Sequence, residues 1–297
     1  MPYHALCFDA PALSAERWAD ALLAAGALSV DLADACAGTP SERPQYGEPD
    51  HSPLPPWPVS RIAALFDATR DVPAALAAAA SWMDEPAPPH SLTPVADADW
   101  VRETQAQFVP QRVNERLWIV PSWREPVDPG AVNVRLDPGW AFGTGSHPTT
   151  RLCLRWLAEN VDAQASVLDY GCGSGILAIA AAKLGARRVA GVDVDPQAIA
   201  ASRANAVANG VAAEFALPDE LAAGQFDVVV ANILAQPLEL LAPLLAQRVR
   251  SAGRVVLSGI LEAQAQDVAA AYRRWFNIVP WGSAEGWVTL AGVRFAP

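Results

Sequence analysis

The chain has 297 residues, of which 52% are hydrophobic and 18% are charged, and its formal net charge is −11. This length suggests about two domains with a sizeable core, and the composition excludes a collagen, a coiled coil and a wholly disordered chain. The four cysteines show no C-x-x-C spacing, so we expect reduced thiols and no metal site. We see no signal peptide and no membrane-spanning stretch, and we therefore predict a cytoplasmic protein without a membrane partner.

The acidity of the chain is concentrated in its first third. Residues 1–100 contain four arginines, no lysine and fourteen acidic residues, whereas the rest of the chain is nearly neutral. An acidic surface of this kind repels nucleic-acid backbones and favours a basic partner, although it can also serve solubility alone.

The first third has the apolar pattern of a small α+β domain. Strands are predicted over 4–8 and 28–32, apolar spacing resumes over 59–66, and helices are predicted over 12–26 and 72–82. Two strand–helix–strand passes of this size are typical of a ferredoxin-like fold, which we expect over residues 1–92. The proline-rich segments 39–58 and 85–94 are predicted to be an exposed loop and a linker.

The remainder is predicted to contain a linker region over 93–130 and a larger α/β domain over 131–297. Within the linker we expect a short helix over 99–108 and a strand over 117–120, followed by a strand over 131–136. From Pro148 onward strands and helices alternate. This order predicts a doubly wound, Rossmann-like and mostly parallel sheet, with ligands bound beyond the carboxyl ends of its strands.

A glycine-rich turn follows the first strand of that sheet, which ends at Asp169. Gly171, Gly173 and Gly175 allow the backbone to turn tightly and to lie against a ligand. A dinucleotide-binding loop has the spacing G-x-G-x-x-G, but here position 176 is Ile. The turn is therefore a poor pyrophosphate site, and by itself it is a weak signal that a structural turn would also explain.

Polar side chains also follow the next two predicted strands. Asp193 ends one of them, where a carboxylate can accept both hydroxyls of a ribose. Asp195, directly before Pro196, suits a helix N-cap, which leaves Asp193 without a local role. Asn232 follows the buried strand 226–231, and a polar amide there is costly unless it is bonded or faces a cleft. A turn residue bonding only backbone is the alternative for Asn232.

The segment from Asp137 to Thr150 precedes this domain and is dense in glycine and hydroxyl groups. We expect it to form a lid or wall over the ligand. His147 could act as a general base, but a histidine before proline in a loop is more often structural.

At these residues the chain resembles a known family. The run D-P-G-W-A-F-G-T-G-S-H-P-T-T over 137–150 is similar to the signature of PrmA, the bacterial ribosomal-protein (L-eleven) methyltransferase family. The segments V-L-D-Y-G-C-G-S-G-I-L-A-I-A over 167–180, N-I-L-A over 232–235 and S-G-I-L over 258–261 match as well. Trp140 replaces a usual Leu and Ser146 replaces a Thr, and the match is weaker over residues 1–96.

The resemblance implies S-adenosylmethionine as the cofactor, with contacts at Thr150, Gly171, Asp193 and Asn232; we add Gly173 from the glycine turn. It also implies methylation of lysine side-chain and N-terminal amines of a large-subunit ribosomal protein, recognised by residues 1–92, either free or on the ribosome, with no sequence-specific contact to nucleic acid. We assign Asn232 as catalytic, since its amide oxygen, with the Ile233 carbonyl, could accept the amine hydrogens. Methylation of another protein or small amine, a dehydrogenase and a non-catalytic binding module are the alternatives.

Overall fold

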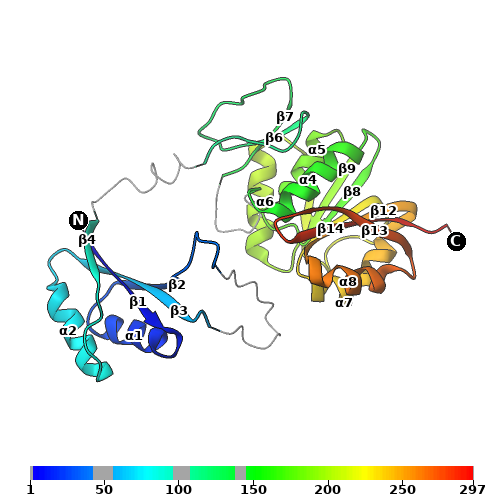
Figure 1. Cartoon of the computed structure of the whole chain (residues 1–297). Helices are drawn as coiled ribbons and strands as arrows, with labels where there is room; N and C mark the ends of the chain where they lie inside the picture. The colour runs from blue at the N-terminus through cyan, green and yellow to red at the C-terminus, as the bar shows by residue number, and fades with distance from the viewer. Residues whose placement is uncertain (1–2, 43–55, 96–107, 138–144, 297) are drawn as a thin grey trace. The chain divides into compact units, whose positions relative to one another are not determined.

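The computed structural model describes residues 3–42, 56–95, 108–137 and 145–296. The chain divides into two compact units, residues 1–103 and residues 104–297, each with its own core (Figure 1). No helix in the described part of the chain is long and apolar enough to cross a membrane.

The N-terminal unit is an antiparallel sheet with two helices. Its elements in chain order are β1 (Tyr3–Pro11), α1 (Ala12–Ala24), β2 (Ser29–Asp34), β3 (Val59–Asp67), α2 (Val72–Met83) and β4 (Ser91–Val95). The strand order is β2-β3-β1-β4. Alternate residues of β1 and β3, such as Leu6 and Phe66, are buried in one cluster with Trp18 of α1 and Leu76 of α2. This is the ferredoxin-like arrangement that the sequence predicted.

The prediction of a linker over 85–94 is wrong for its last four residues. Ser91–Val95 forms β4 and pairs antiparallel with β1, with Pro94 opposite His4. A proline donates no backbone hydrogen bond, and it is tolerated here because β4 is an edge strand. The boundary expected at residue 92 therefore falls inside a strand. Residues 99–107 of the helix expected over 99–108, and most of the loop expected over 39–58, lie outside the described residues.

The second unit starts with a small three-stranded sheet, in the order β5 (Gln111–Arg112), β6 (Leu117–Val120) and β7 (Val132–Arg135). Two side chains attach this sheet to the helices of the larger sheet. Arg116 donates a hydrogen bond to the Ala158 carbonyl at 2.9 Å. The Asn209 amide accepts from the Arg135 backbone N–H at 2.8 Å and donates to its carbonyl at 2.7 Å. The described part of the expected linker region therefore includes strands of this second unit.

The larger sheet has seven strands in the order β10-β9-β8-β11-β12-β14-β13. The strands are β8 (Ser166–Tyr170), β9 (Arg188–Val192), β10 (Glu214–Ala216), β11 (Phe226–Asn232), β12 (Val249–Leu261), β13 (Phe276–Ala284) and β14 (Trp287–Arg294). The helices are α4 (Pro148–Asn160), α5 (Ile176–Lys183), α6 (Pro196–Ala208), α7 (Ala235–Arg248) and α8 (Ala265–Tyr272), and a short 3₁₀ turn, η1, covers Glu262–Gln264. The first five strands of this order run parallel, and β14 is antiparallel to both of its neighbours.

Helices cover both faces of the seven-stranded sheet (Figure 1). Val228 and Val230 of β11 belong to the core that contains α4 and α5, whereas Val229 and Ala231 belong to the core that contains α7 and α8. A strand buried on both faces is almost entirely apolar, and the run Val228 to Ala231 after Asp227 could therefore be recognised from sequence. The doubly wound fold expected for this region is confirmed. Its topology brings the carboxyl ends of β9, β8 and β11 side by side.

Candidate functional site

The turn after β8 is built from glycines in a left-handed conformation. Gly171, Gly173 and Gly175 have φ angles of 80°, 52° and 78°. The backbone N–H groups of Gly171 and Cys172 both donate to the Val192 carbonyl, at 2.8 and 2.9 Å, which ties the turn to the end of β9. A Cβ added at residue 171 would lie 2.3 Å from Cγ2 of Ile233. Glycine is therefore required at residue 171 by backbone conformation and by space.

Asp193 closes this turn from the end of β9. Its carboxylate accepts hydrogen bonds from the backbone N–H of Gly173 at 2.8 Å and of Asp195 at 3.0 Å. The sequence-based view that Asp193 lacks a local role is thus wrong, because the carboxylate orders the glycine turn. The side chain is half-buried, and carboxylate oxygens can accept further hydrogen bonds. Asp195 caps α6 through the Gln197 N–H at 2.8 Å, as expected.

Asn232 and Thr150, far apart in sequence, are in contact. Nδ2 of Asn232, at the end of β11, donates a hydrogen bond to Oγ1 of Thr150 in the first turn of α4, at 3.2 Å. Thr150 is buried and Asn232 is half-buried. The next residue, Ile233, is confined on two sides, since a Cβ at Gly171 would strike its side chain and a Cβ at Gly259 would lie 2.2 Å from its carbonyl oxygen. Sequence reasoning did not identify this role of Gly259, although its presence in the S-G-I-L segment was a signal.

Asp169 is fully buried at the base of the glycine turn. Its Oδ2 accepts a hydrogen bond from the Ala178 N–H in α5 at 3.1 Å, and its Oδ1 has no hydrogen-bond partner among the described residues. Burial raises the pKa of Asp169 to about 7, and the nearby charge of Asp193 adds to this effect. A buried ionisable group with a shifted pKa is typical of a functional site.

The segment before α4 is described only in part, because residues 138–144, and with them most of the expected lid, lie outside the described residues. Asp137 is anchored to the N–H and Oγ of Ser122, at 2.6 and 2.7 Å. His147 is the N-cap of α4 and accepts from the Thr149 N–H at 3.3 Å. Its ring contacts Trp287 edge-on with centroids 5.0 Å apart, and burial lowers its pKa. These contacts give His147 a structural role.

The residues expected to bind the cofactor therefore lie together at one edge of the sheet, where the carboxyl ends of β9, β8 and β11 meet. This edge offers a backbone turn without side chains at Gly171 and Gly173, a half-buried carboxylate at Asp193, and an amide at Asn232. Such a set fits a nucleoside with a ribose and an attached amino-acid group better than it fits a pyrophosphate, since a glycine is missing from the dinucleotide spacing.

Comparison with known proteins agrees with this geometry. The family model of ribosomal protein L11 methyltransferase (PrmA) matches residues 2–294 of the chain. The chain belongs to the PrmA family. A ribosomal protein L11 methyltransferase of Thiobacillus denitrificans is 58% identical over 295 residues, covering 99% of this chain and 100% of the relative. One from Laribacter hongkongensis is 55% identical over the full length of both chains.

A solved structure of a PrmA-type protein supports the fold. The ribosomal protein L11 methylase of Lactobacillus delbrueckii subsp. bulgaricus is 36% identical, with a TM-score of 0.58, over 64% of this chain and 100% of that chain. As a PrmA-family member, the protein is a methyltransferase and its cofactor is S-adenosylmethionine. Family membership thus confirms the resemblance found in the sequence and excludes the dehydrogenase.

Proposed function

We propose that this protein transfers methyl groups from S-adenosylmethionine to lysine side-chain and N-terminal amines of ribosomal protein L11, in the cytoplasm. The names of its relatives support the substrate. The observation that carries the proposal is the hydrogen bond between Asn232 and Thr150, which holds an amide at the edge of the sheet where Gly171 and Asp193 lie. We assign the cofactor contacts to Thr150, Gly171, Gly173, Asp193 and Asn232.

The bound cofactor supplies a sulfonium methyl group and a good leaving group. The protein must therefore position a neutral amine, although a free lysine has a pKa of about 10.4. Apolar side chains border this edge, among them Ile233 and the partly exposed Leu234. Removing the amine from water there disfavours its charged form and lowers its pKa, which makes the lone pair available.

Asn232 can then orient the amine. An amide group is planar, so the hydrogen bond from Nδ2 to Thr150 directs Oδ1 to the opposite side, where Oδ1 has no hydrogen bond to the described residues. This oxygen can accept an amine hydrogen and aim the lone pair. The Ile233 carbonyl is the second acceptor, and glycine at residue 259 is needed because a side chain there would cover its oxygen. Alignment of this kind is a major source of rate acceleration.

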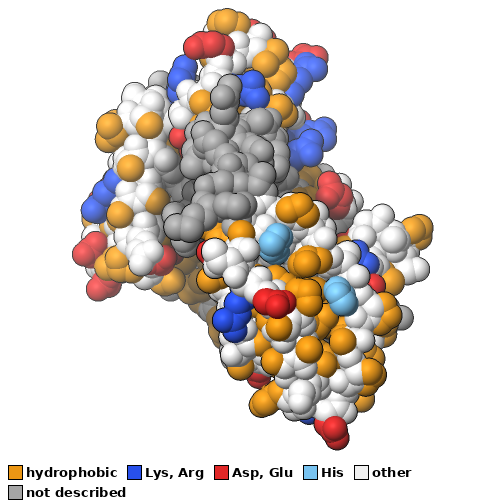
Figure 2. Space-filling view, turned by 90° about the vertical axis from the view of Figure 1, so that its left-hand side faces the viewer, with side chains coloured by type: hydrophobic (Ala, Val, Ile, Leu, Met, Phe, Trp, Pro, Cys, Tyr) orange, Lys and Arg blue, Asp and Glu red, His pale blue; other side chains and the backbone are white. Residues whose placement is uncertain are grey.

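We propose that the N-terminal unit, which includes the predicted domain 1–92, recognises the protein substrate, while residues 131–297 carry out the transfer. The excess of acidic residues in this part of the chain supports a basic partner. Large hydrophobic side chains of this unit are also exposed, with Leu13 at 94% and Trp82 at 61%. Figure 2 shows hydrophobic side chains spread over one face of the molecule, among uncharged, acidic and basic groups. Such exposed apolar groups are available for contact with a protein.

The proposal is tested by incubating the purified protein with methyl-labelled S-adenosylmethionine and isolated ribosomal proteins, in parallel with intact large subunits. Mass spectrometry is expected to place the label on lysine and N-terminal amines of L11, and the comparison shows whether free or assembled L11 is preferred. The Asn232→Ala variant serves as the inactive control. Label found only on another protein or on small amines would contradict the substrate assignment.

A further inference from the structure

We propose that the seven-stranded sheet binds the phosphate backbone of RNA, without sequence preference, along the side where its parallel strands begin. This side is opposite the cofactor site. We call this surface the arginine edge. It consists of seven arginines at or next to the ends of β9, β12, β13 and β14 on this side of the sheet: Arg187, Arg188, Arg250, Arg254, Arg273, Arg274 and Arg294. This inference does not depend on which protein is methylated.

Strand register places these arginines at one end of the sheet. Arg188 is the first residue of the parallel strand β9. Arg254 pairs with Val228, near the start of β11. Arg294 ends the antiparallel strand β14, opposite Phe276, the first residue of β13. All of them are therefore at the amino ends of the parallel strands, away from the glycine turn.

A projecting turn within β12 extends the arginine edge. Between the pairs formed by Val249 and Arg254 the register shifts, and Ala252 adopts a left-handed conformation with φ of 56°. Gly253 follows, where a Cβ would lie 2.8 Å from the Arg250 carbonyl oxygen. This tight turn carries Arg250, whose side chain is half exposed.

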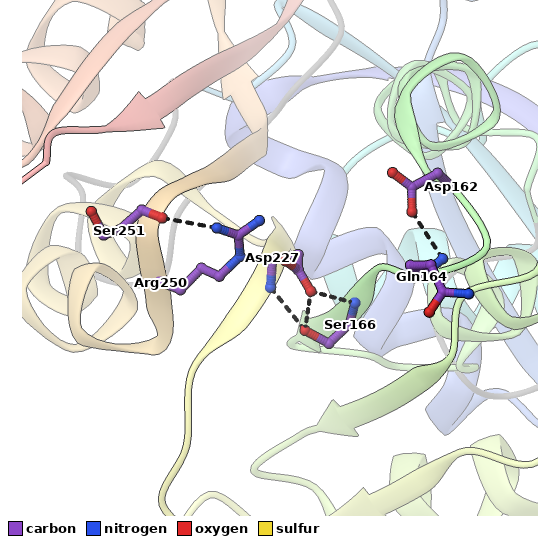
Figure 3. A network of polar contacts seen from close by, with 6 residues as sticks. All are labelled: Asp162, Gln164, Ser166, Asp227, Arg250 and Ser251. Atoms are coloured by element: carbon purple, nitrogen blue, oxygen red, sulfur yellow. Dashed lines mark hydrogen bonds and ion pairs between the residues drawn. The ribbon is translucent and has the colours of Figure 1, made fainter.

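Carboxylates compensate only part of this positive charge. Figure 3 shows two of them, Asp227 and Asp162, and a third, Glu214, is the first residue of β10 beside β9. Asp227 forms an ion pair with Arg250 and accepts from the N–H and Oγ of Ser166. Burial opposes its ionisation, but these hydrogen bonds prevail and lower the pKa of Asp227 to about 2, so it is charged at neutral pH. Asp162 accepts from the Gln164 N–H.

Other arginines are held by neutral groups. The Arg188 guanidinium lies 4.7 Å from the ring centroid of Phe226. Arg254 donates to Oδ1 of Asn160 at 3.0 Å and lies 5.9 Å from the Trp156 ring. These partners orient the guanidinium groups without neutralising them, which leaves donors for the bidentate contacts that arginine makes with phosphate.

The helix dipole does not account for the whole arrangement. A cation after a helix is stabilised by the negative end of the dipole, and this explains Arg273, which follows α8. Arg250 follows the C-cap of α7 and is favoured in the same way, whereas Arg254 lies inside β12, away from any helix end. The arginine edge runs from β9 to β13, across six neighbouring strands. At about 4.8 Å per strand it is about 24 Å long, which is enough for several successive phosphates of a single strand.

The test is fluorescence anisotropy with the full-length protein and a labelled single-stranded RNA of about 20 nucleotides, over a range of salt concentrations. The variant R187E/R273E reverses two exposed charges of the arginine edge. The matched control R112E/R124E makes the same charge change at exposed arginines elsewhere in the second unit. Poly-glutamate of similar length is the competitor that represents an acidic protein.

We expect the wild type and the control to bind RNA with a strong salt dependence, and R187E/R273E to bind at least about tenfold more weakly. Its slope of log affinity against log salt should be smaller by about 1.4, or about 0.7 for each lost phosphate contact. Methylation of free protein by both variants should remain normal, which separates this proposal from the methyltransferase assignment. Equal RNA affinity of the two variants, no binding by the wild type, or equally tight binding of poly-glutamate would overturn it.

Discussion

The amide of Asn232 donates a hydrogen bond to the hydroxyl of Thr150 at 3.2 Å, and this bond joins the carboxyl end of β11 to the first turn of α4. One residue comes from the N-I-L-A segment and the other from the H-P-T-T segment, and they lie 82 residues apart in the sequence. The bond fixes the orientation of the amide, whose oxygen we propose faces the substrate. Both residues can be tested separately.

Asn232→Ala removes the acceptor that we assign to the amine. We expect kcat to fall by at least about 100-fold because alignment of the nucleophile is lost. The fold should persist, since Asn232 is only half-buried. Single-turnover methylation measures the rate, and the exposed Asn277→Ala is the matched control. Near-normal turnover in Asn232→Ala would remove Asn232 from the catalytic assignment.

Thr150→Val removes the hydroxyl that orients Asn232 but keeps the shape of a buried side chain. We expect kcat to fall about tenfold or more, because the amide of Asn232 can rotate. Val leaves the donor at Asn232 without its partner, and we expect a loss of stability of about 1–3 kcal/mol. Thr150→Ser keeps the hydroxyl and should restore kcat. A Ser variant as slow as the Val variant would argue that Thr150 acts only through packing.

Gly171→Ala tests whether the turn needs glycine for space as well as for conformation. Gly171 and Gly210 both have positive φ, 80° and 64°, but a Cβ at Gly210 meets no atom within 4 Å. Gly210→Ala should therefore cost only the conformational strain, about 1–2 kcal/mol. Gly171→Ala should cost about 1–3 kcal/mol more from its clash with Ile233, and should weaken cofactor binding. Urea unfolding measures both, and equal costs would contradict the close contact.

Asp193→Asn is expected to weaken S-adenosylmethionine binding by at least about tenfold. The amide nitrogen cannot accept a hydrogen bond, so either the Gly173 or the Asp195 N–H loses its partner. Asp195→Asn is the matched control, because Asn caps a helix about as well as Asp. Calorimetric titration with the cofactor distinguishes them. Unchanged affinity in Asp193→Asn would show that the carboxylate charge is not used.

The buried carboxyl of Asp169 predicts a pH dependence of stability. Burial raises its pKa from 3.8 to about 7, so the folded state holds the proton more tightly than the unfolded state. This contribution favours folding below about pH 4 and is lost as the pH rises through 7, over a total of at most about 4 kcal/mol. Asp169→Asn should therefore flatten the fall in unfolding free energy between pH 5 and 8. An unchanged slope would show that Asp169 does not titrate in this range.

Local sequence patterns predicted most strands and helices of both units. The apolar run 228–231 and the glycines after Asp169 could be interpreted locally, because burial on two faces and a left-handed turn each restrict the residues allowed. Strands were missed where pairing with a neighbouring strand, and not the local sequence pattern, makes the segment extended. Ser91–Val95 contains a proline and resembles a linker, yet it pairs with β1 at the sheet edge. The three-residue strand β10 pairs with β9 and was too short to show any period.

The sequence by itself determined the fold class and the position of the glycine turn, and it indicated the residues that we propose form the site, since these depend on which side chains follow which strands. Only the tertiary structure decided what each residue contacts. Asp193 was expected to be free for a ribose, but it also binds the N–H of Gly173. Ile233 is confined by Gly171 and Gly259, and arginines from separate strands meet at one edge. Such contacts join residues distant in the chain, and strand order and register, which no local pattern specifies, create them.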